Sequence, residues 1–330
     1  MILARTIRVL LGALGLIVCV YEASSQIQFQ QGFSTKPLGK DTLCYSYRWV
    51  AGDTAFFAVE TNDSISLEGQ PVLIKHREEV VRIVCDSVTS QNHYVVTMSI
   101  TSMKEWQSTG TDSAIRTTSP WIGRAITITM DSVGKRYGVR YSDSRPAVSP
   151  GGPFAPSLLP ILASTCGRQN ESWEHNDTTV LVENAIPYPV LLHSTLWRVL
   201  DRLDTMGQHL RQIQYTMSGR GRVDIQGDGM SMIMSTITNG YGKLTFDSVV
   251  RLPFHSFTTM EHKISLELAN GVTREGKHLS ARHVRLTSLV SPDSRRAQEA
   301  ATALQNLRES SVPVRRAPRT QKNSSKKRVR

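Results

Sequence analysis

The histidine, acidic and glycine residues of the sequence lack the spacings that support known kinds of catalysis. The sequence has nine histidines, but Glu261-His262 lacks the second histidine of a His-Glu-x-x-His zinc motif. It also contains no Gly-x-Ser-x-Gly nucleophile elbow. Gly219-Arg220-Gly221 and Gly227-Asp228-Gly229 lack the strand-to-helix context of a phosphate loop, and we interpret them as turns or bulges. We therefore assign no catalytic residue, no metal ligand and no cofactor.

Basic residues are concentrated at the carboxyl end of the chain. The whole sequence has 39 Lys and Arg against 28 Asp and Glu, a net charge of +11. Eleven of these cations and three of the acids fall between Ser291 and Arg330, so the rest of the chain is close to neutral. Beyond Glu309 no acid remains, and a tail this polar cannot bury enough apolar surface to fold, so we expect it to be disordered. Its candidate anion-binding residues are Arg315, Arg316, Arg319, Lys322, Lys326, Lys327, Arg328 and Arg330.

The amino terminus has the pattern of a secretory signal peptide. Arg5 and Arg8 precede an apolar run from Val9 to Tyr21, and Ala23-Ser24-Ser25 offers small residues for cleavage. The run is shorter than the roughly 20 residues of a membrane-spanning helix. We predict a signal over residues 1–25; an uncleaved anchor, or a lipid on Cys19, is the less favoured alternative.

An export signal changes the expected partner of the tail. In an exported protein, an anionic envelope surface or an acidic polymer is a more fitting partner than intracellular nucleic acid. Such binding is electrostatic and weakens as salt rises. The alternative is a solvated tail without a dedicated partner.

Three cysteines remain after residue 25, namely Cys44, Cys85 and Cys166. An exported chain with three cysteines permits one disulfide. Cys44 and Cys85 both lie in strand-like runs of the first half, so they are our first candidate pair. Cys166 could compete for either, and three reduced, buried thiols are the other possibility. There is no Cys-x-x-Cys, the motif of zinc ribbons and thioredoxin-type sites.

Alternation of apolar and polar residues predicts strands through residues 26–144. Short runs bounded by turn residues predict two hairpins, one turning at residues 89–92 and the other at Asp131–Lys135. The predicted strands are Leu43–Trp49, Thr54–Glu60, Val80–Val88, His93–Thr101, Ala125–Met130 and Tyr137–Tyr141.

Residues 170–290 show the same alternation of apolar and polar residues, interrupted by turn residues. Asn270-Gly271 predicts a hairpin turn, since both residue types tolerate positive φ. The predicted strands of this half are Leu196–Leu203, His209–Met217, Lys243–Val250, Ser256–Leu268 and His278–Leu289. Between the halves, the first part of residues 145–169 contains five prolines within 16 residues, from Arg145 to Pro160. This proline content excludes helix interiors and central strands. We interpret this segment as a connector, and the whole as a mostly antiparallel all-β protein.

A repeated pattern suggests that the two halves are copies of one β unit. Ile128–Lys135 and Leu244–Arg251 share the order apolar-Thr-apolar-Asp-Ser-Val-x-basic. Arg82–Val88 and Arg198–Leu203 form a second, weaker pair at nearly the same spacing. The Asp-Ser in the first pair is explained by turn chemistry, so we do not interpret Asp131 or Asp247 as catalytic.

The last predicted element is a short helix at the start of residues 291–330. Ser291-Pro292-Asp293-Ser294 can cap it. The small and apolar residues that follow are three or four apart, and they predict one narrow stripe. These residues are Ala297, Ala300, Ala301, Leu304 and Leu307.

Three features together resemble a known class of protein. They are the charged signal ending in Ser-Ser-Gln, the aromatic strand leading into Gly52-Asp53-Thr54, and the turn Asp131–Lys135. The chain from about Leu43 to Leu268 is similar to uncharacterised secreted β-rich proteins of Gram-negative bacteria, in which a proline-rich stretch joins two related halves. The resemblance implies export and a β fold but no activity.

Taken together, these patterns favour an exported, non-enzymatic, envelope-associated binding or structural protein that is periplasmic or extracellular. Its cationic tail would contact the anionic surface. Two alternatives remain. One is a periplasmic carrier whose curved sheet shelters a lipid or other apolar ligand. The other is an enzyme whose residues are assembled across the fold.

Overall fold

The computed structural model describes most of the chain after residue 41 as antiparallel sheet followed by one helix. This confirms the predicted all-β class with a short carboxyl-terminal helix, α2 (Ser294–Ser310). The described residues are 42–43, 45–110, 112–119, 121–142, 157–162, 167–168, 172–179, 182–183, 186–187, 191–203, 210–227 and 230–310.

One large sheet contains twelve of the strands, in the order β7-β6-β4-β3-β2-β16-β15-β14-β13-β12-β9, with β5 paired to the far end of β4. Its strands are β2 (Thr54–Leu67), β3 (Leu73–Val88), β4 (Tyr94–Thr109), β5 (Asp112–Arg116), β6 (Ala125–Met130), β7 (Arg136–Tyr141), β9 (Ser172–Thr179), β12 (Leu191–Leu203), β13 (Leu210–Gly227), β14 (Met230–Asp247), β15 (Leu252–Leu268) and β16 (Thr273–Val290). Two small pairs are separate, β1 (Thr42–Leu43) with β8 (Gly167–Arg168) and β10 (Val182–Glu183) with β11 (Ile186–Pro187).

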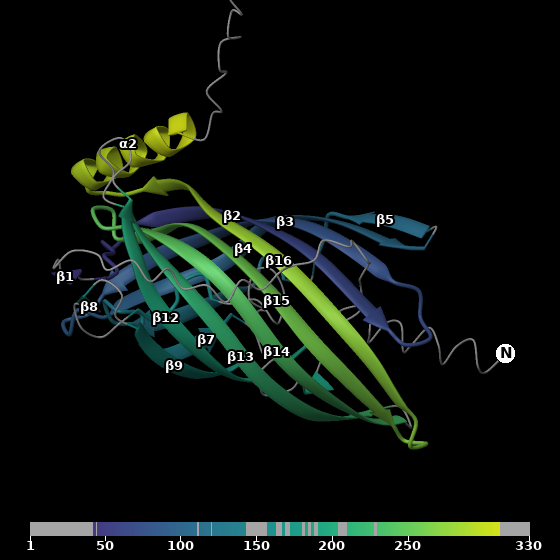
Figure 1. Cartoon of the computed structure of the whole chain (residues 1–330). Coiled ribbons are helices and arrows are strands. Elements are labelled where there is room, and N and C mark those ends of the chain that lie inside the picture. Colours follow the sequence, from purple (N-terminus) through teal and green to yellow (C-terminus); the bar gives the residue numbers. More distant parts are fainter. Residues whose placement is uncertain are drawn as a thin grey trace, which may run out of the picture.

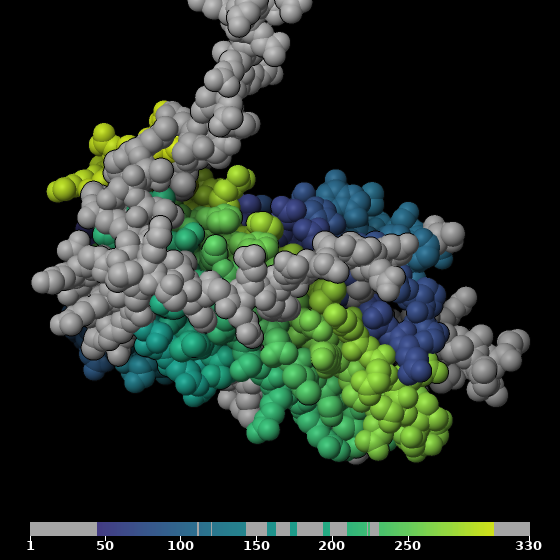
Figure 2. Space-filling view, in the orientation of Figure 1, coloured from purple at the N-terminus to yellow at the C-terminus, as the bar shows by residue number. Residues whose placement is uncertain are grey.

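The two predicted halves share this single sheet. Strand β2, the first long strand, pairs with β16, the last, in a register that places Val59 opposite Val284. The sheet is long and strongly curved, and α2 lies across one end of it (Figure 1). On the outside, the surface of the amino-terminal strands lies directly against that of the carboxyl-terminal strands (Figure 2).

The core lies on the inner face of the curved sheet, as period-two burial dictates. In β2 every second side chain is buried from Ala55 to Leu67. Large apolar side chains from both halves meet in one cluster, including Phe57, Ile83, Phe246 and Leu286.

The predicted hairpin turns are present. β3 and β4 are joined at residues 89–92, where Asn92 has φ +59° and Thr89 N donates to His93 O at 2.8 Å. β15 and β16 turn at Gly271, with φ +76°, and Val272 N donates to Asn270 Oδ1 at 3.1 Å.

The two copies of the repeated pattern form similar turns. Asp131 Oδ1 accepts hydrogen bonds from Val133 N at 3.0 Å and Lys135 N at 2.9 Å. Asp247 Oδ1 accepts from Val249 N at 2.8 Å and Val250 N at 2.7 Å. Each aspartate satisfies backbone amides where two strands join, the role that the sequence predicted for it.

The prediction of a strand over Leu43–Trp49 is wrong for residues 45–49. Residues 45–50 have no regular structure, yet their alternation is real, since Tyr45, Tyr47 and Trp49 are buried and Arg48 is exposed. The segment inserts its aromatic rings into the end of the core instead of pairing with a strand. Tyr47 N donates to Ser132 O at 2.6 Å.

The proline-rich stretch ends inside the core. Leu158, Leu159 and Leu162 are buried, and Leu162 N donates to Val133 O at 2.8 Å. Tyr47 OH donates to Pro160 O at 2.7 Å. This part of the predicted connector therefore closes one end of the sheet, whereas residues 143–156 lie outside the described range.

Among the described residues, no helix is both long enough and apolar enough to cross a bilayer.

Candidate functional site

Helix α2 packs on the sheet through a face centred on an arginine. Arg296 and Ala300 are buried, Ala303 is nearly so, and Leu304 packs against the core. The predicted stripe is thus partly wrong, because Ala301 is exposed. The helix is rotated so that Arg296, which is not part of the predicted stripe, faces inward.

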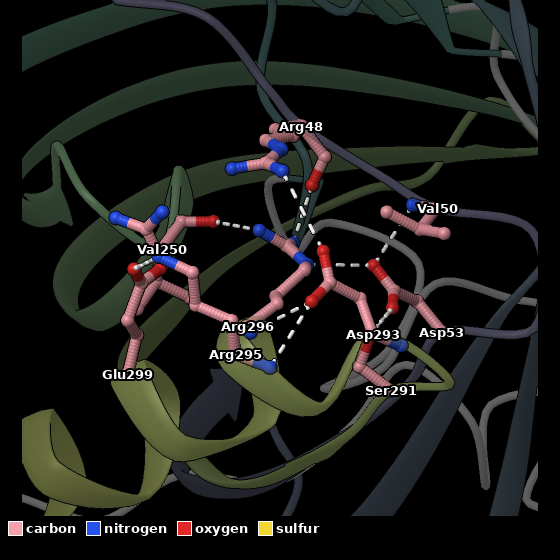
Figure 3. Close-up of polar contacts among 9 residues, drawn as sticks. All are labelled: Arg48, Val50, Asp53, Val250, Ser291, Asp293, Arg295, Arg296 and Glu299. Carbon is pink, nitrogen blue, oxygen red and sulfur yellow. Dashed lines mark hydrogen bonds and ion pairs between the residues drawn. The ribbon is translucent and has the colours of Figure 1, made fainter.

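Arg296 forms a buried ion pair with Asp53, which precedes β2. Arg296 Nε donates to Asp53 Oδ2 at 2.8 Å, and the two side chains are only 1% and 0% exposed. Arg296 Nη1 donates to Val250 O at 2.8 Å, and Nη2 donates to Arg48 O. Figure 3 shows the guanidinium reaching from α2 between these groups, so one side chain joins the helix, the β14–β15 turn and the segment before β2.

The carboxylate of Asp53 has further donors. Val50 N donates to its Oδ2 at 2.9 Å, and Ser291 Oγ donates to its Oδ1. These bonds offset the cost of burying a charge, which is high unless the charge is both paired and hydrogen-bonded. Next to Asp53, Gly52 has φ +92°, and a Cβ there would lie 3.3 Å from Pro292.

Asp293 caps the helix, as predicted. Its Oδ1 accepts from Arg295 N at 3.1 Å and from Arg296 N at 3.2 Å, which satisfies free amides of the first turn. Its Oδ2 lies 3.7 Å from Arg48 Nη2 (Figure 3). We call Asp53, Asp293 and Arg296 together the helix anchor. The basic residues from Arg315 to Arg330 follow this helix and lie outside the described range.

A second polar group lies on the inner face of the sheet, midway along the strands. We call it the polar belt. Its ionisable members are Asp63, Lys75, Arg77, Glu79, Glu105, His262, His278 and Arg282, which come from β2, β3, β4, β15 and β16. Apolar layers flank it on both sides, with Phe57 and Val59 on one and Ile264 and Leu266 on the other.

Asp63 and His278 are close enough to form an ion pair within this belt. His278 Nε2 lies 2.9 Å from Asp63 Oδ1. Burial on its own would raise the pKa of Asp63. The hydrogen bond and charge of His278, together with Arg77 and Ser280, outweigh burial and lower the pKa to about 2. Asp63 is therefore an anion throughout the physiological range.

Arginines on neighbouring strands complete the belt. Arg77 Nε lies 3.7 Å from Glu79 Oε1, and Nη1 lies 3.9 Å from Glu105 Oε2. Burial lowers the pKa of Arg282 to about 10, although Glu79 opposes that shift. By formal charge, the three cations Lys75, Arg77 and Arg282 balance the three anions Asp63, Glu79 and Glu105 within the belt.

Hydroxyl groups extend the belt across β13, β14 and β15. Thr238 Oγ1 and His262 Nδ1 are 2.7 Å apart, and Tyr215 OH bonds to Thr258 Oγ1. The Tyr215 ring crosses the bare backbone of Gly242, where an added Cβ would lie 2.3 Å from ring atom Cζ. The glycine therefore provides the space in which the tyrosine reaches β15.

Chemically, the belt offers charge and hydrogen bonding inside an apolar interior. The buried hydroxyl groups of Thr61 and Thr236 have no hydrogen-bond partner among the described residues. Within the same residues, no three His, Cys, Asp or Glu side chains are grouped so that they could hold a metal ion. The belt thus consists of paired charges, together with two buried hydroxyl groups that can still form hydrogen bonds.

Cys85 is a free, buried thiol in the structure. Its Sγ donates to Ser87 O at 3.6 Å, and burial, assisted by Asp53 and Asp86, raises its pKa to about 12. The predicted partner Cys44 lies outside the described residues, as does Cys166, so the pairing stays a prediction.

Neither the helix anchor nor the polar belt was predicted from the sequence. The sequence of β2 does contain a signal for the belt. Asp63 is an even number of residues from Phe57, Val59 and Ile65, so its side chain must lie on the same buried face of the strand. No comparable local signal marked Arg296.

No protein-family model matches the sequence, and no curated protein is significantly similar to it.

Proposed function

We propose that this is an exported, non-enzymatic binding or structural protein of the cell envelope, whose basic tail contacts an anionic surface. The helix anchor carries the proposal. Because Arg296 and Asp53 fix α2 to the sheet, the tail beginning after Ser310 starts from a rigid point on the folded body. A cationic tail of this kind can attach the body to a surface without taking part in the fold.

The charge of the tail supports an anionic partner. Its eight cations are not interrupted by any acid after Glu309. Each Lys or Arg near an anionic membrane surface contributes about 1 kcal/mol at low salt, and this attraction is screened within a Debye length. Eight weak contributions can therefore give strong binding that is steeply salt-dependent.

The test compares residues 26–330 with a variant that lacks Val312–Arg330, on vesicles of phosphatidylcholine with and without phosphatidylglycerol. We expect the intact chain to bind the anionic vesicles and to dissociate as salt rises, and the truncated chain not to bind. A variant with the eight cations replaced by glutamine keeps the length of the tail and should behave like the truncation. Binding that survives either change would place the function in the sheet and overturn the proposal.

A carrier of an amphipathic apolar ligand is a second candidate, favoured by the polar belt. A sheet that needs only a core has no use for seven buried ionisable groups between two apolar layers, whereas an amphipathic ligand would contact both environments. Native mass spectrometry of the purified protein, followed by extraction with organic solvent, tests this. A bound lipid that is lost on extraction supports the carrier, and protein of the bare chain mass counts against it.

A further inference from the structure

Strands β1 and β8 lie side by side beyond one end of the large sheet (Figure 1). Their antiparallel register is defined by two pairs, because Thr42 is opposite Arg168 and Leu43 is opposite Gly167. In an antiparallel ladder, a step forward along one strand is a step back along the other. The next step therefore matches the position after Leu43 with the position before Gly167.

Both of these positions are cysteines, Cys44 and Cys166. They lie outside the described range, but their neighbours in the sequence do not. Leu43 and Tyr45 are described on either side of position 44, and Gly167 directly follows position 166. Because consecutive Cα atoms are about 3.8 Å apart, these neighbours restrict where the two cysteines can lie.

The chain segments that lead away from β1 and β8 also contact each other. Tyr47 OH donates to Pro160 O at 2.7 Å, and both residues lie against the turn at Gly134. The β1–β8 pair is thus one part of a longer contact between the segment before β2 and the segment before β9.

We propose that Cys44 and Cys166 form a disulfide bond that joins β1 to β8, and that Cys85 is the unpaired thiol. Directly opposite Cα atoms in an antiparallel pair are about 4.5–5.5 Å apart, which falls within the range that disulfides span, about 4.4–6.8 Å. Opposite residues also have their side chains on the same face of the ladder. The β1–β8 register thus favours a different pair from Cys44 and Cys85, which strand patterns in the sequence suggested.

The surroundings of Cys85 suit an unpaired thiol. Its side chain is buried in the core, and Sγ donates to Ser87 O at 3.6 Å. Its backbone is also held in place, since Cys85 N donates to Asp53 O and Gly52 N donates to Cys85 O, each at 2.8 Å. Buried thiols of this kind are inert compared with exposed ones.

Formation of the bond in the cell rests on the proposed export, because disulfides persist in oxidising compartments. The reaction is thiol–disulfide exchange with a disulfide donor, such as oxidised glutathione. The thiolate of one cysteine attacks the donor and releases one thiol, and the thiolate of the other cysteine then attacks the mixed disulfide and releases the second thiol. The donor gains two electrons, and the two protons of the cysteines end on its two thiols.

Peptide mapping tests the pairing on the purified chain, independently of export and of the tail. Residues 26–330 are equilibrated with oxidised and reduced glutathione, blocked with iodoacetamide in urea and digested with trypsin without reductant. Trypsin separates the three cysteines into the peptides Asp41–Arg48, Ile83–Lys104 and Tyr141–Arg168. We expect the first and third peptides to be linked and the second to be alkylated. A link that includes Ile83–Lys104, or no link at all, would overturn the proposal.

Urea unfolding tests whether the bond stabilises the fold. The bond closes a long loop that contains β2–β7, so reduction should lower the wild-type midpoint by about 1 M. Cys44→Ser should abolish this difference between oxidised and reduced protein. The matched variant Cys85→Ala should keep it, because each variant is compared with its own reduced form. A difference that survives in Cys44→Ser or disappears in Cys85→Ala would contradict the pairing, as would a wild-type midpoint that reduction leaves unchanged.

Discussion

The side chains of Asp53 and Arg296 meet at 2.8 Å although they are 243 residues apart in the sequence. Together they connect the start of β2 with the helix that follows β16, the two strands that join the halves of the sheet. The same guanidinium also bonds the carbonyls of Arg48 and Val250. One buried ion pair therefore holds the segment before the sheet, a turn within it and the helix after it.

Replacing Arg296 should destabilise the protein severely. Arg296→Ala leaves the Asp53 carboxylate buried without its cation, a change that typically costs about 3–5 kcal/mol. Arg295→Ala is the control, because Arg295 is 89% exposed and bonds only Glu299 at 3.0 Å among its described side-chain contacts. Its loss should cost well under 1 kcal/mol. Urea unfolding measures both, and similar losses would contradict the anchoring role of Arg296.

A partner substitution separates lost charge from lost packing. In the double variant Asp53→Asn with Arg296→Met, no buried charge is left unpaired. We expect it to be more stable than Arg296→Met alone, which has the same side-chain volume at position 296, because removing both charges of a buried pair costs less than removing one. A double variant that is no more stable would mean that packing, not charge, explains the loss.

The hairpins were predictable because their signals are local. Strand alternation and the turn at Asn270-Gly271 depend on neighbours in the sequence, and the structure confirms both. The exit of Tyr45–Trp49 from the sheet was not predictable in the same way. Alternation predicts which side chains are buried, but pairing depends on a strand elsewhere. Here the rings of Tyr45 and Tyr47 pack against the ring of Phe246, with centroids 6.0 and 5.9 Å from its centroid.

Both polar groups depend on distant contacts, which explains why they were missed. Asp63 and His278 are 215 residues apart, and only the β2–β16 register brings them together. The sequence shows that Asp63 shares the buried parity of β2, but it does not show which cation lies opposite. Arg296 fits an exposed helix face equally well until the Asp53 carboxylate is placed beneath it.

Gly134 should tolerate substitution much less than Gly271. Both have positive φ, +87° and +76°, so alanine brings a similar backbone cost of about 1–2 kcal/mol at each. A Cβ at Gly134 would also lie 2.9 Å from Pro160 O and from the Tyr47 ring, whereas Gly271 faces open space. Chemical denaturation should show a further loss of about 1–3 kcal/mol for Gly134→Ala. Equal losses would mean that the packing of Tyr47 and Pro160 against this turn does not contribute.

Cys85 should resist alkylation until the protein unfolds. Its thiol is buried and its pKa is raised to about 12, so the reactive thiolate is scarce at neutral pH. We expect iodoacetamide to label it rapidly in urea without reductant, as mass spectrometry of peptides can show. Labelling that also requires a reductant would instead support a disulfide of Cys85 with Cys44 or Cys166.

The pair of Asp63 and His278 should make stability depend on acid. The pKa of Asp63 in the folded protein is about 2, below its ordinary value of 3.8. A lowered pKa stabilises the fold above the ordinary value, and that stability is lost as pH falls from about 4 towards 2. The shift corresponds to about 2 kcal/mol at neutral pH. Asp63→Asn removes this titration, so its free energy of unfolding should fall less steeply over that pH range than that of the wild type.

Asp112, an exposed aspartate on β5, provides the control Asp112→Asn, which should keep the wild-type slope. Urea unfolding at several pH values measures the slopes, and an unchanged slope for Asp63→Asn would show that His278 does not stabilise the carboxylate in this way.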